Sequence, residues 1–131
     1  MSHDFHSRPF TLDERLQFTK MRGREVYKFA VTTMQEAIAE ALRETNLTVD
    51  DVAMVVPHQS NLRIIESARD KLGIPSEKMC VNIDRLGNTS AASVPICLDE
   101  LRREGRIGPG DIILSVAFGA GLTWANAVFR L

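Results

Sequence analysis

The sequence is poor in cysteine, in net charge and in long apolar runs, and each shortage excludes a class of protein. Its two cysteines, Cys80 and Cys97, are too few for the disulfide framework of a small secreted protein. A net charge of −1 argues against nucleic acid as the main partner, because binding to phosphates needs a basic excess. No apolar run approaches the ~20 residues of a membrane span. We therefore predict a cytoplasmic protein that binds neither nucleic acid nor a membrane.

A single folded domain accounts for most of the chain. Its 131 residues, 44% of them hydrophobic and 25% charged, have the composition of a globular domain large enough to bury a core. From Arg24 to Arg43 apolar residues recur at three-and-four spacing, which predicts a long helix with one buried face. Residues 1–20 show no strong period. We expect an N-terminal arm or loop over residues 1–20 and the folded domain over residues 21–131.

Beyond this helix, short apolar runs alternate with amphipathic stretches. The runs predict short strands, the last two joined as a hairpin, at 52–56, 79–83, 112–118 and 123–130. Two further helices are predicted, over about 61–72 with Leu62 facing the core, and from the Gly87–Asn88 loop to about residue 104. The order α-β-α-β-α-β-β indicates an α/β fold, in which helices pack on a mixed sheet.

Two polar segments follow the first two predicted strands, at the strand ends where an α/β sheet usually carries its chemistry. They are Pro57–Asn61 and Gly87–Ser93. A neutral imidazole at His58 can donate a hydrogen bond to an oxyanion or act as an acid or base. Its position alone is equally compatible with a structural histidine that caps a helix or fills the core.

Asn88 and the segment Gly119-Ala120-Gly121 each have two interpretations. Asn88 is either a second donor to an oxyanion or a turn and capping residue, and the local pattern favours capping. Gly119, Ala120 and Gly121 either bring backbone N–H groups close to a ligand or form a plain hairpin turn. A strand rather than a helix follows them, so they are no dinucleotide fingerprint.

The remaining candidates are weaker. Cys80 and Cys97 lie in apolar surroundings and are predicted to be buried structural thiols rather than nucleophiles. His3 and His6 provide only two ligands on an arm, so we predict no metal site. Several arginines are either solvated residues of helix faces or a docking patch for an acidic partner: Arg63, Arg69, Arg102, Arg103 and Arg106.

Four segments together resemble the C-terminal half of β-ketoacyl-acyl carrier protein synthase III, a thiolase-fold condensing enzyme. They are residues 21–31, 57–61, 84–95 and 117–124. The resemblance implies a Cys-His-Asn triad, with His58 as its histidine and Asn88 as its asparagine. It places the cysteine in an N-terminal half that this chain does not contain. The implied reaction needs no cofactor: an acyl group from acyl-coenzyme A is condensed with malonyl-acyl carrier protein.

The resemblance also implies roles for other residues and for partners. It assigns Gly119, Ala120 and Gly121 to an oxyanion loop, and Phe118 to the acyl pocket, although Ala120 and Leu122 replace the glycine and phenylalanine of many relatives. It also implies that the pantetheine channel is lined by Gly23, Ser60 and Asn61. Arg63 is implied to dock the carrier protein. Expected partners are the cysteine-bearing half and a second copy of the chain. A non-catalytic module that binds thioesters or carrier protein is the alternative, and a weak thioester hydrolase is a third possibility.

Overall fold

The computed structural model describes residues 21–131, so the arm expected over residues 1–20, with His3 and His6, lies outside the described residues. The helices and strands follow in this order: α1 (Gly23–Thr45), β1 (Met54–Pro57), α2 (Leu62–Leu72), η2 (Ser76–Lys78), α3 (Ile83–Leu86), η3 (Ser90–Ala92), α4 (Ser93–Arg103), β2 (Ile112–Gly119) and β3 (Thr123–Arg130). Among the helices of residues 21–131, none combines the length and apolar character that a membrane crossing requires.

The three strands form one mixed sheet in the order β1-β2-β3. β1 pairs with β2 in parallel, with Met54 opposite Ile113. β2 pairs with β3 in antiparallel fashion, and the hairpin closes at Gly119 opposite Thr123. The predicted mixed sheet and its C-terminal hairpin are therefore confirmed. The carboxyl ends of β1 and β2 lie at the same edge of the sheet, because these two strands run parallel.

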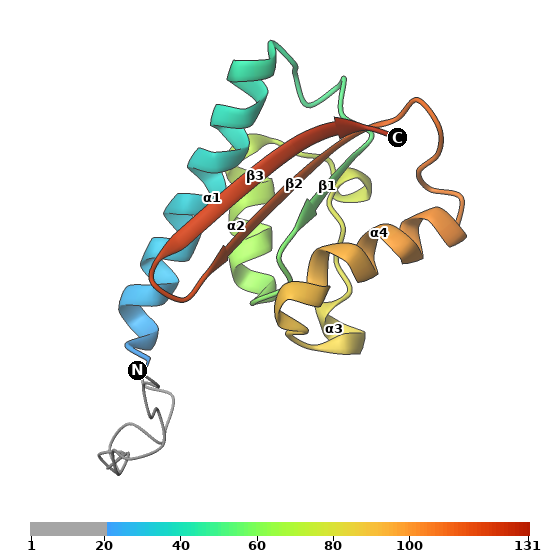
Figure 1. The fold of residues 1–131 in the computed structure, drawn as a ribbon. Helices are drawn as coiled ribbons and strands as arrows, with labels where there is room; N and C mark the ends of the chain where they lie inside the picture. Colours follow the sequence, from blue (N-terminus) through green and yellow to red (C-terminus); the bar gives the residue numbers. More distant parts are fainter. Residues whose placement is uncertain (1–20) are drawn as a thin grey trace, which may run out of the picture.

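Helices cover both faces of this sheet, α1 and α2 on one side and α4 on the other (Figure 1). Alternate residues of a strand point to opposite faces, so each strand contributes to two cores. Val55 and Leu114 join the core beneath α1 and α2. Met54 and Ile113 join the core beneath α4. This two-sided burial explains why the first and third predicted strands read as continuous apolar runs.

The first two helices, α1 and α2, begin and end close to the predicted boundaries. α1 ends at Asn46, which adopts a left-handed conformation with φ 54°. The side chain of Asn61 caps α2 by accepting the backbone N–H of Arg63 at 2.9 Å, and Gly73 ends it with φ 63°. The prediction that Leu62 faces the core is wrong, because its side chain is 39% exposed and Ile64 is buried in its place.

The strand predicted over 79–83 does not form. Met79 makes a single isolated bridge to Val55, and the short helix α3 already begins at Ile83. The physical reason lies in a side chain: Oε1 of Gln59 accepts the backbone N–H groups of Asn82 and Ile83 at 2.9 and 3.2 Å. These groups are not paired with a neighbouring strand, so the chain turns into a helix instead.

Candidate functional site

Segments from four parts of the chain meet around one cavity of about 560 Å³. They are the start of α1, the residues after β1, the loop after α3 and the β2–β3 hairpin. All site residues predicted from the sequence except Arg63 line this cavity: Gly23, His58, Ser60, Asn61, Asn88, Phe118, Gly119, Ala120 and Gly121. A second cavity of about 410 Å³ also has His58 and Asn88 in its lining. The two side chains therefore lie where both cavities meet.

His58 is held rigidly at the end of β1. Its backbone N–H donates to the carbonyl oxygen of Val116 at 2.7 Å, which extends the pairing of β1 with β2 by one residue. The ring of Phe118 lies edge-on to the imidazole, with 5.5 Å between ring centroids. Burial lowers the pKa of His58 below its ordinary value of 6.5, because desolvation disfavours the charged form. The neutral form of the imidazole is therefore favoured at pH 7.

One ring nitrogen of His58 contacts a residue that the sequence analysis missed. Nδ1 lies 2.9 Å from Oγ of Ser93, the first residue of α4 and a buried one. Ser93 Oγ also lies 2.8 Å from the carbonyl oxygen of Ser90. With Nδ1 occupied in this way, Nε2 is the nitrogen left to act on a ligand.

The carboxamide of Asn88 is oriented by its own loop. Its Oδ1 accepts the backbone N–H of Ser90 at 3.0 Å, the bond expected of a turn residue. Asn88 does not cap α4, which begins at Ser93. Because the oxygen is engaged, the amide nitrogen Nδ2 is the group available to donate into the cavity. The turn role and the donor role are thus compatible in one side chain.

Gln59 links the loop of His58 to the segment that leads to Asn88. Its side chain is fully buried. Nε2 donates to the carbonyl oxygens of Pro57 and Cys80 at 2.9 and 3.1 Å, while Oε1 accepts the two N–H groups that end the predicted second strand. Both donors and both lone pairs of the amide are used. Sequence reasoning missed this role, because a single polar residue between His58 and Ser60 has no periodic signal.

The β2–β3 hairpin forms the wall beside these two side chains. Ala120, Gly121 and Leu122 make its loop, and Gly121 and Leu122 have positive φ values of 79° and 54°. Glycine adopts such a conformation without steric cost, whereas leucine does not. The segment Gly119–Gly121 is therefore a hairpin turn that also lines the cavity, so its two interpretations do not exclude each other.

Two polar residues that line the cavity after His58, Ser60 and Asn61, have hydrogen-bonding groups that the described residues do not use. Oγ of Ser60 is buried and has no hydrogen-bond partner among the described residues. Buried hydroxyl groups rarely lack a partner, so this one is a hydrogen-bonding group that the described residues leave unused. Asn61 uses Oδ1 to cap α2, which leaves its amide nitrogen as a donor.

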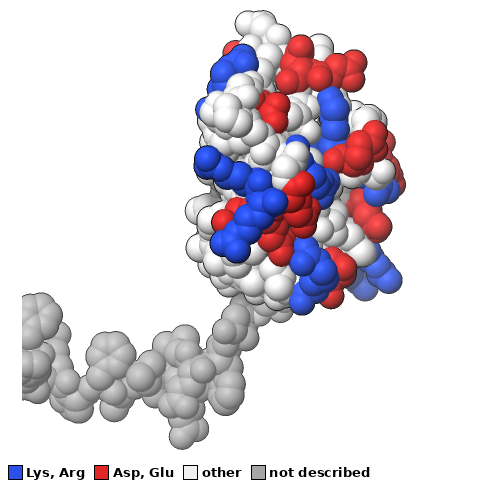
Figure 2. Space-filling model, turned by 90° about the vertical axis from the view of Figure 1, so that its right-hand side faces the viewer, with Lys and Arg blue, Asp and Glu red and all other residues white. Residues whose placement is uncertain are grey.

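The other sequence candidates lie away from this cavity. Arg63 is exposed on the first turn of α2. Cys80 and Cys97 are buried in the core beneath α4, and the hydrogen bond with Cys80, together with burial, raises the pKa of the Cys97 thiol. No cluster of metal-ligating side chains occurs within residues 21–131. On the face of the molecule shown in Figure 2, basic and acidic side chains are interspersed rather than separated by sign.

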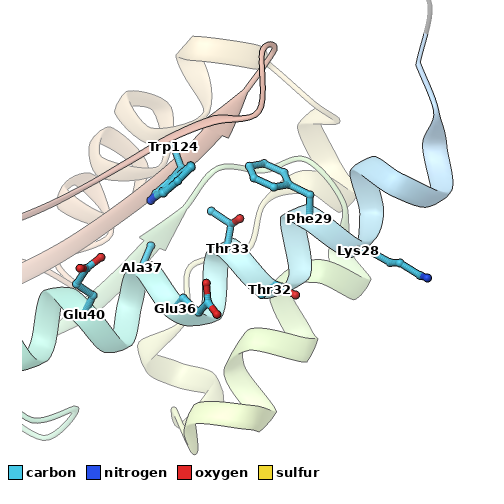
Figure 3. Close-up of a pocket in the computed structure, with 8 residues that line it drawn as sticks. All are labelled: Lys28, Phe29, Thr32, Thr33, Glu36, Ala37, Glu40 and Trp124. Carbon is cyan, nitrogen blue, oxygen red and sulfur yellow. The ribbon is translucent and has the colours of Figure 1, made fainter.

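A separate groove of about 470 Å³ lies between α1 and β3 (Figure 3). Phe29 and Trp124 form its aromatic part, with 6.1 Å between ring centroids, and Glu36 and Glu40 contribute carboxylates. Figure 3 shows Lys28 extending away from Trp124. Neither His58 nor Asn88 reaches this groove, so the candidate chemistry is confined to the cavity at the strand ends.

Known proteins are similar to this chain in sequence and in structure. A family model described as 3-oxoacyl-[acyl-carrier-protein (ACP)] synthase III C terminal matches residues 42–131. The chain is 52% identical over 120 residues to beta-ketoacyl-ACP synthase III of Caldanaerobacter subterraneus, covering 92% of this chain and 36% of the relative. The Staphylococcus saprophyticus synthase III is 56% identical over 110 residues, 84% of this chain and 35% of the relative.

Solved structures of synthase III enzymes also resemble this chain. The Thermus thermophilus synthase III has a TM-score of 0.83 at 54% identity, covering 86% of this chain and 35% of that one. The Aquifex aeolicus synthase III has a TM-score of 0.85 at 45% identity, covering 90% and 38%. These likenesses confirm the predicted fold, the C-terminal half of a thiolase-like architecture. The chain spans about a third of the length of the curated relatives it matches.

Proposed function

Because the chain belongs to the family of 3-oxoacyl-acyl carrier protein synthase III C-terminal domains, we propose that it provides the hydrogen-bond donors for a decarboxylative Claisen condensation. An acyl group from acyl-coenzyme A is attacked by the carbanion that forms when malonyl-acyl carrier protein loses CO2. His58 and Asn88 donate to the thioester oxygen of the malonyl group. The observation that carries the proposal is that both side chains line the same cavity of about 560 Å³.

The charge of these donors suits the reaction. As CO2 leaves, the electron pair of the breaking C–C bond moves onto the thioester oxygen, and donors aimed at that oxygen lower the barrier. Removing one donor of this kind costs about 2.7–4 kcal/mol of transition-state stabilisation. Burial keeps His58 neutral, and a carboxamide never carries a charge. Neither group therefore forms an ion pair with the malonyl carboxylate before it leaves, and both can donate to the oxygen that gains charge in the transition state.

The surrounding residues suit a long thioester arm. The unpartnered hydroxyl of Ser60 and the amide nitrogen of Asn61 are placed to bind the amide groups of pantetheine, beside Gly23. Phe118, which also lines the second cavity, faces the acyl group. The exposed cation of Arg63 is available to the acidic surface of a carrier protein.

We assign the acyl-accepting cysteine to an N-terminal part of the enzyme. Cys80 and Cys97 are buried beneath α4, and no cysteine of residues 21–131 lines either cavity at His58. The backbone of Gly119–Gly121 and the N–H of that cysteine form the oxyanion pocket of the acyl-enzyme. Assembly with a cysteine-bearing part, pairing of two copies and a cytoplasmic location belong to this proposal.

The second candidate is a module that binds thioesters or carrier protein without catalysis. The observation that favours it is the same lining: among residues 21–131 the cavity has hydrogen-bonding groups and no thiol. Binding without turnover is what this chain would show in the absence of a cysteine-bearing part.

A chimera separates the two functions. This chain replaces the matching part of the Caldanaerobacter synthase III, which is 52% identical, and condensation of acetyl-coenzyme A with malonyl-acyl carrier protein is measured. We expect turnover by the chimera, and His58→Ala or Asn88→Ala should each lower kcat about 100- to 1,000-fold. Asn126→Ala is the matched control, because this carboxamide lies on β3 and bonds to the carbonyl oxygen of Ala37.

Full turnover in both cavity variants would refute the donor roles. A folded chimera that binds malonyl-coenzyme A in calorimetry without condensing it would establish the binding module instead.

A further inference from the structure

The buried serine Ser93 contacts Nδ1 of His58. Whether Nδ1 carries the proton of the neutral ring determines whether Nε2 presents an N–H or a lone pair to the cavity. Ser93 is 1% exposed, and its Oγ lies 2.9 Å from Nδ1. We propose that Ser93 is a positioning residue whose hydroxyl donates to Nδ1, so that the single proton of neutral His58 stays on Nε2 and points into the cavity. This inference rests on the proposed function, since a donor to the thioester oxygen must carry its proton on Nε2.

Ser93 is not itself a nucleophile, despite its contact with a histidine. A serine nucleophile must reach substrate while a base takes its proton. Ser93 is buried and belongs to the lining of neither cavity at His58. It contacts the nitrogen that faces away from these cavities, so its influence on a substrate must pass through His58.

The hydroxyl of Ser93 has two acceptors within reach, and its bond to the Ser90 carbonyl is the shorter one. The one proton of this hydroxyl can go to the carbonyl oxygen of Ser90 at 2.8 Å or to His58 Nδ1 at 2.9 Å. The Ser90 carbonyl already accepts the backbone N–H of Ser93, so it keeps a hydrogen bond when the hydroxyl turns away. Within residues 21–131, the Ser93 hydroxyl is the partner found for Nδ1.

Thr89 orients the Ser93 hydroxyl from the other side. Its Oγ1 lies 3.4 Å from Ser93 Oγ and donates to it. Because the Ser93 oxygen accepts this proton, its own proton is directed toward a further acceptor. Thr89, Ser93 and His58 thus form a row of donors that ends at Nε2–H, and hydrogen bonds in such a row strengthen one another.

The tautomer decides whether His58 stabilises or opposes the reaction. With the proton on Nε2, the ring donates to the oxygen that gains negative charge. With the proton on Nδ1, a neutral ring presents a lone pair to that oxygen, and repulsion replaces attraction. At metal sites, losing the hydrogen-bond partner that fixes a histidine tautomer typically lowers affinity or activity about 10- to 100-fold, and we expect a loss of similar size here.

Nitrogen NMR of the full 131-residue chain tests the tautomer directly. The chain carries ¹⁵N-labelled histidine and the substitutions His3→Gln and His6→Gln, so that His58 is the only signal, and spectra are recorded where the imidazole is neutral. We expect Nδ1 to resonate as an unprotonated nitrogen and Nε2 as a protonated one. Ser93→Ala should mix the tautomers, whereas Ser93→Thr, which keeps a hydroxyl, should restore the native spectrum.

Kinetics of the chimera give the second readout. Ser93→Ala should lower kcat about 10- to 100-fold with KM unchanged, and Ser93→Thr should recover most of it. Ser115→Ala is the matched control, because this serine bonds to a carbonyl oxygen on the paired strand outside the cavity.

Each outcome decides one proposal. A wild-type spectrum with the proton on Nδ1 would overturn the role of Ser93, even if Ser93→Ala fails to fold. A spectrum and kcat that are unchanged in Ser93→Ala would overturn it as well. Full activity in His58→Ala would instead refute the proposed function, whichever tautomer the spectrum shows.

Discussion

The two candidate donors come from loops that are held in different ways. The histidine loop, residues 57–61, is anchored from the interior by the fully buried side chain of Gln59. The asparagine loop, residues 87–92, lies mostly at the surface. The helix α3 before it is tied to α4 by Arg85 and Glu100, whose side chains are only 3.0 Å apart but partly exposed.

This difference matches the chemistry of the two side chains. An imidazole titrates near neutral pH, so burial is needed to keep it neutral, and burial requires that every nearby polar group be satisfied. A carboxamide does not titrate. Asn88 therefore tolerates exposure, provided that its oxygen is held, as it is by Ser90. One cavity can therefore hold two equivalent donors that have unequal structural support.

The largest effect on stability is expected from replacing Gln59, the buried residue that anchors the histidine loop. Gln59→Leu removes the partner of two carbonyl oxygens and two N–H groups. A buried group left without a partner costs about 1–3 kcal/mol, so we expect the free energy of unfolding to fall by at least about 3 kcal/mol. Urea unfolding of the chain, followed by circular dichroism, measures the change.

A second glutamine provides the control for this prediction. Gln35 bonds to Ser67 across the contact of α1 and α2 at 3.2 Å, and it is only partly buried. Gln35→Leu should cost about 1 kcal/mol. Equal losses in the two variants would contradict the interior anchoring of the histidine loop.

A smaller effect on stability is expected from replacing Glu100, which ties α3 to α4 at the surface. Glu100 accepts hydrogen bonds from Arg85 and Asn82, which lower the pKa of its carboxyl group. Glu100→Gln should lower the melting temperature slightly and increase hydrogen exchange in residues 83–92. Asp99→Asn is the control, because within residues 21–131 Asp99 pairs with Arg103 on the same helix. If Asp99→Asn loosens residues 83–92 as much, Glu100 is not their anchor.

The smallest effect concerns pH. Burial lowers the pKa of His58 below 6.5, so just below that pH the unfolded chain binds more protons than the folded one. Stability that depends on neutral His58 is therefore present above pH 6.5 and is lost as the pH falls through the lowered pKa. Urea unfolding from pH 8 to about pH 5 should show a shallower loss in His58→Gln than in the wild type.

Asn88→Ala is the control for the pH dependence of unfolding, because a carboxamide has no charge to titrate. Its loss of stability between neutral and acid pH should parallel that of the wild type. If His58→Gln gives the same profile as Asn88→Ala, burial of the imidazole does not contribute to the acid sensitivity of the chain.

Much of the fold could be predicted because its signals are local. The periodicity of residues 24–43 identified α1, and Asn46 and Gly73 ended helices where their left-handed conformations are tolerated. His58, Asn88 and the hairpin line one cavity, and the roles predicted for them from the sequence stay predictions. His58 and the hairpin follow the ends of β1 and β2, which parallel pairing brings to one edge of the sheet, whereas Asn88 follows the short helix α3 instead of the predicted strand.

What could not be predicted depends on contacts between distant residues. The run 79–83 is apolar enough for a strand, but Gln59 takes the N–H groups of Asn82 and Ile83, and no periodic pattern reports a hydrogen bond across 23 positions. Ser93 was part of a recognised segment, yet its role depends on a contact with His58 across 35 positions.

The sequence by itself determined the long helix α1, the strands β1, β2 and β3 and the residue types at the cavity, because hydrophobic periodicity and turn chemistry act over a few residues. Only the tertiary structure decided which nitrogen of His58 faces the cavity side, that the carboxamide oxygen rather than the nitrogen of Asn88 is engaged, and which buried amide joins the histidine loop to the segment before Asn88. Hydrogen bonds are short and directional, so these choices depend on atoms that folding alone brings within about 3 Å of one another.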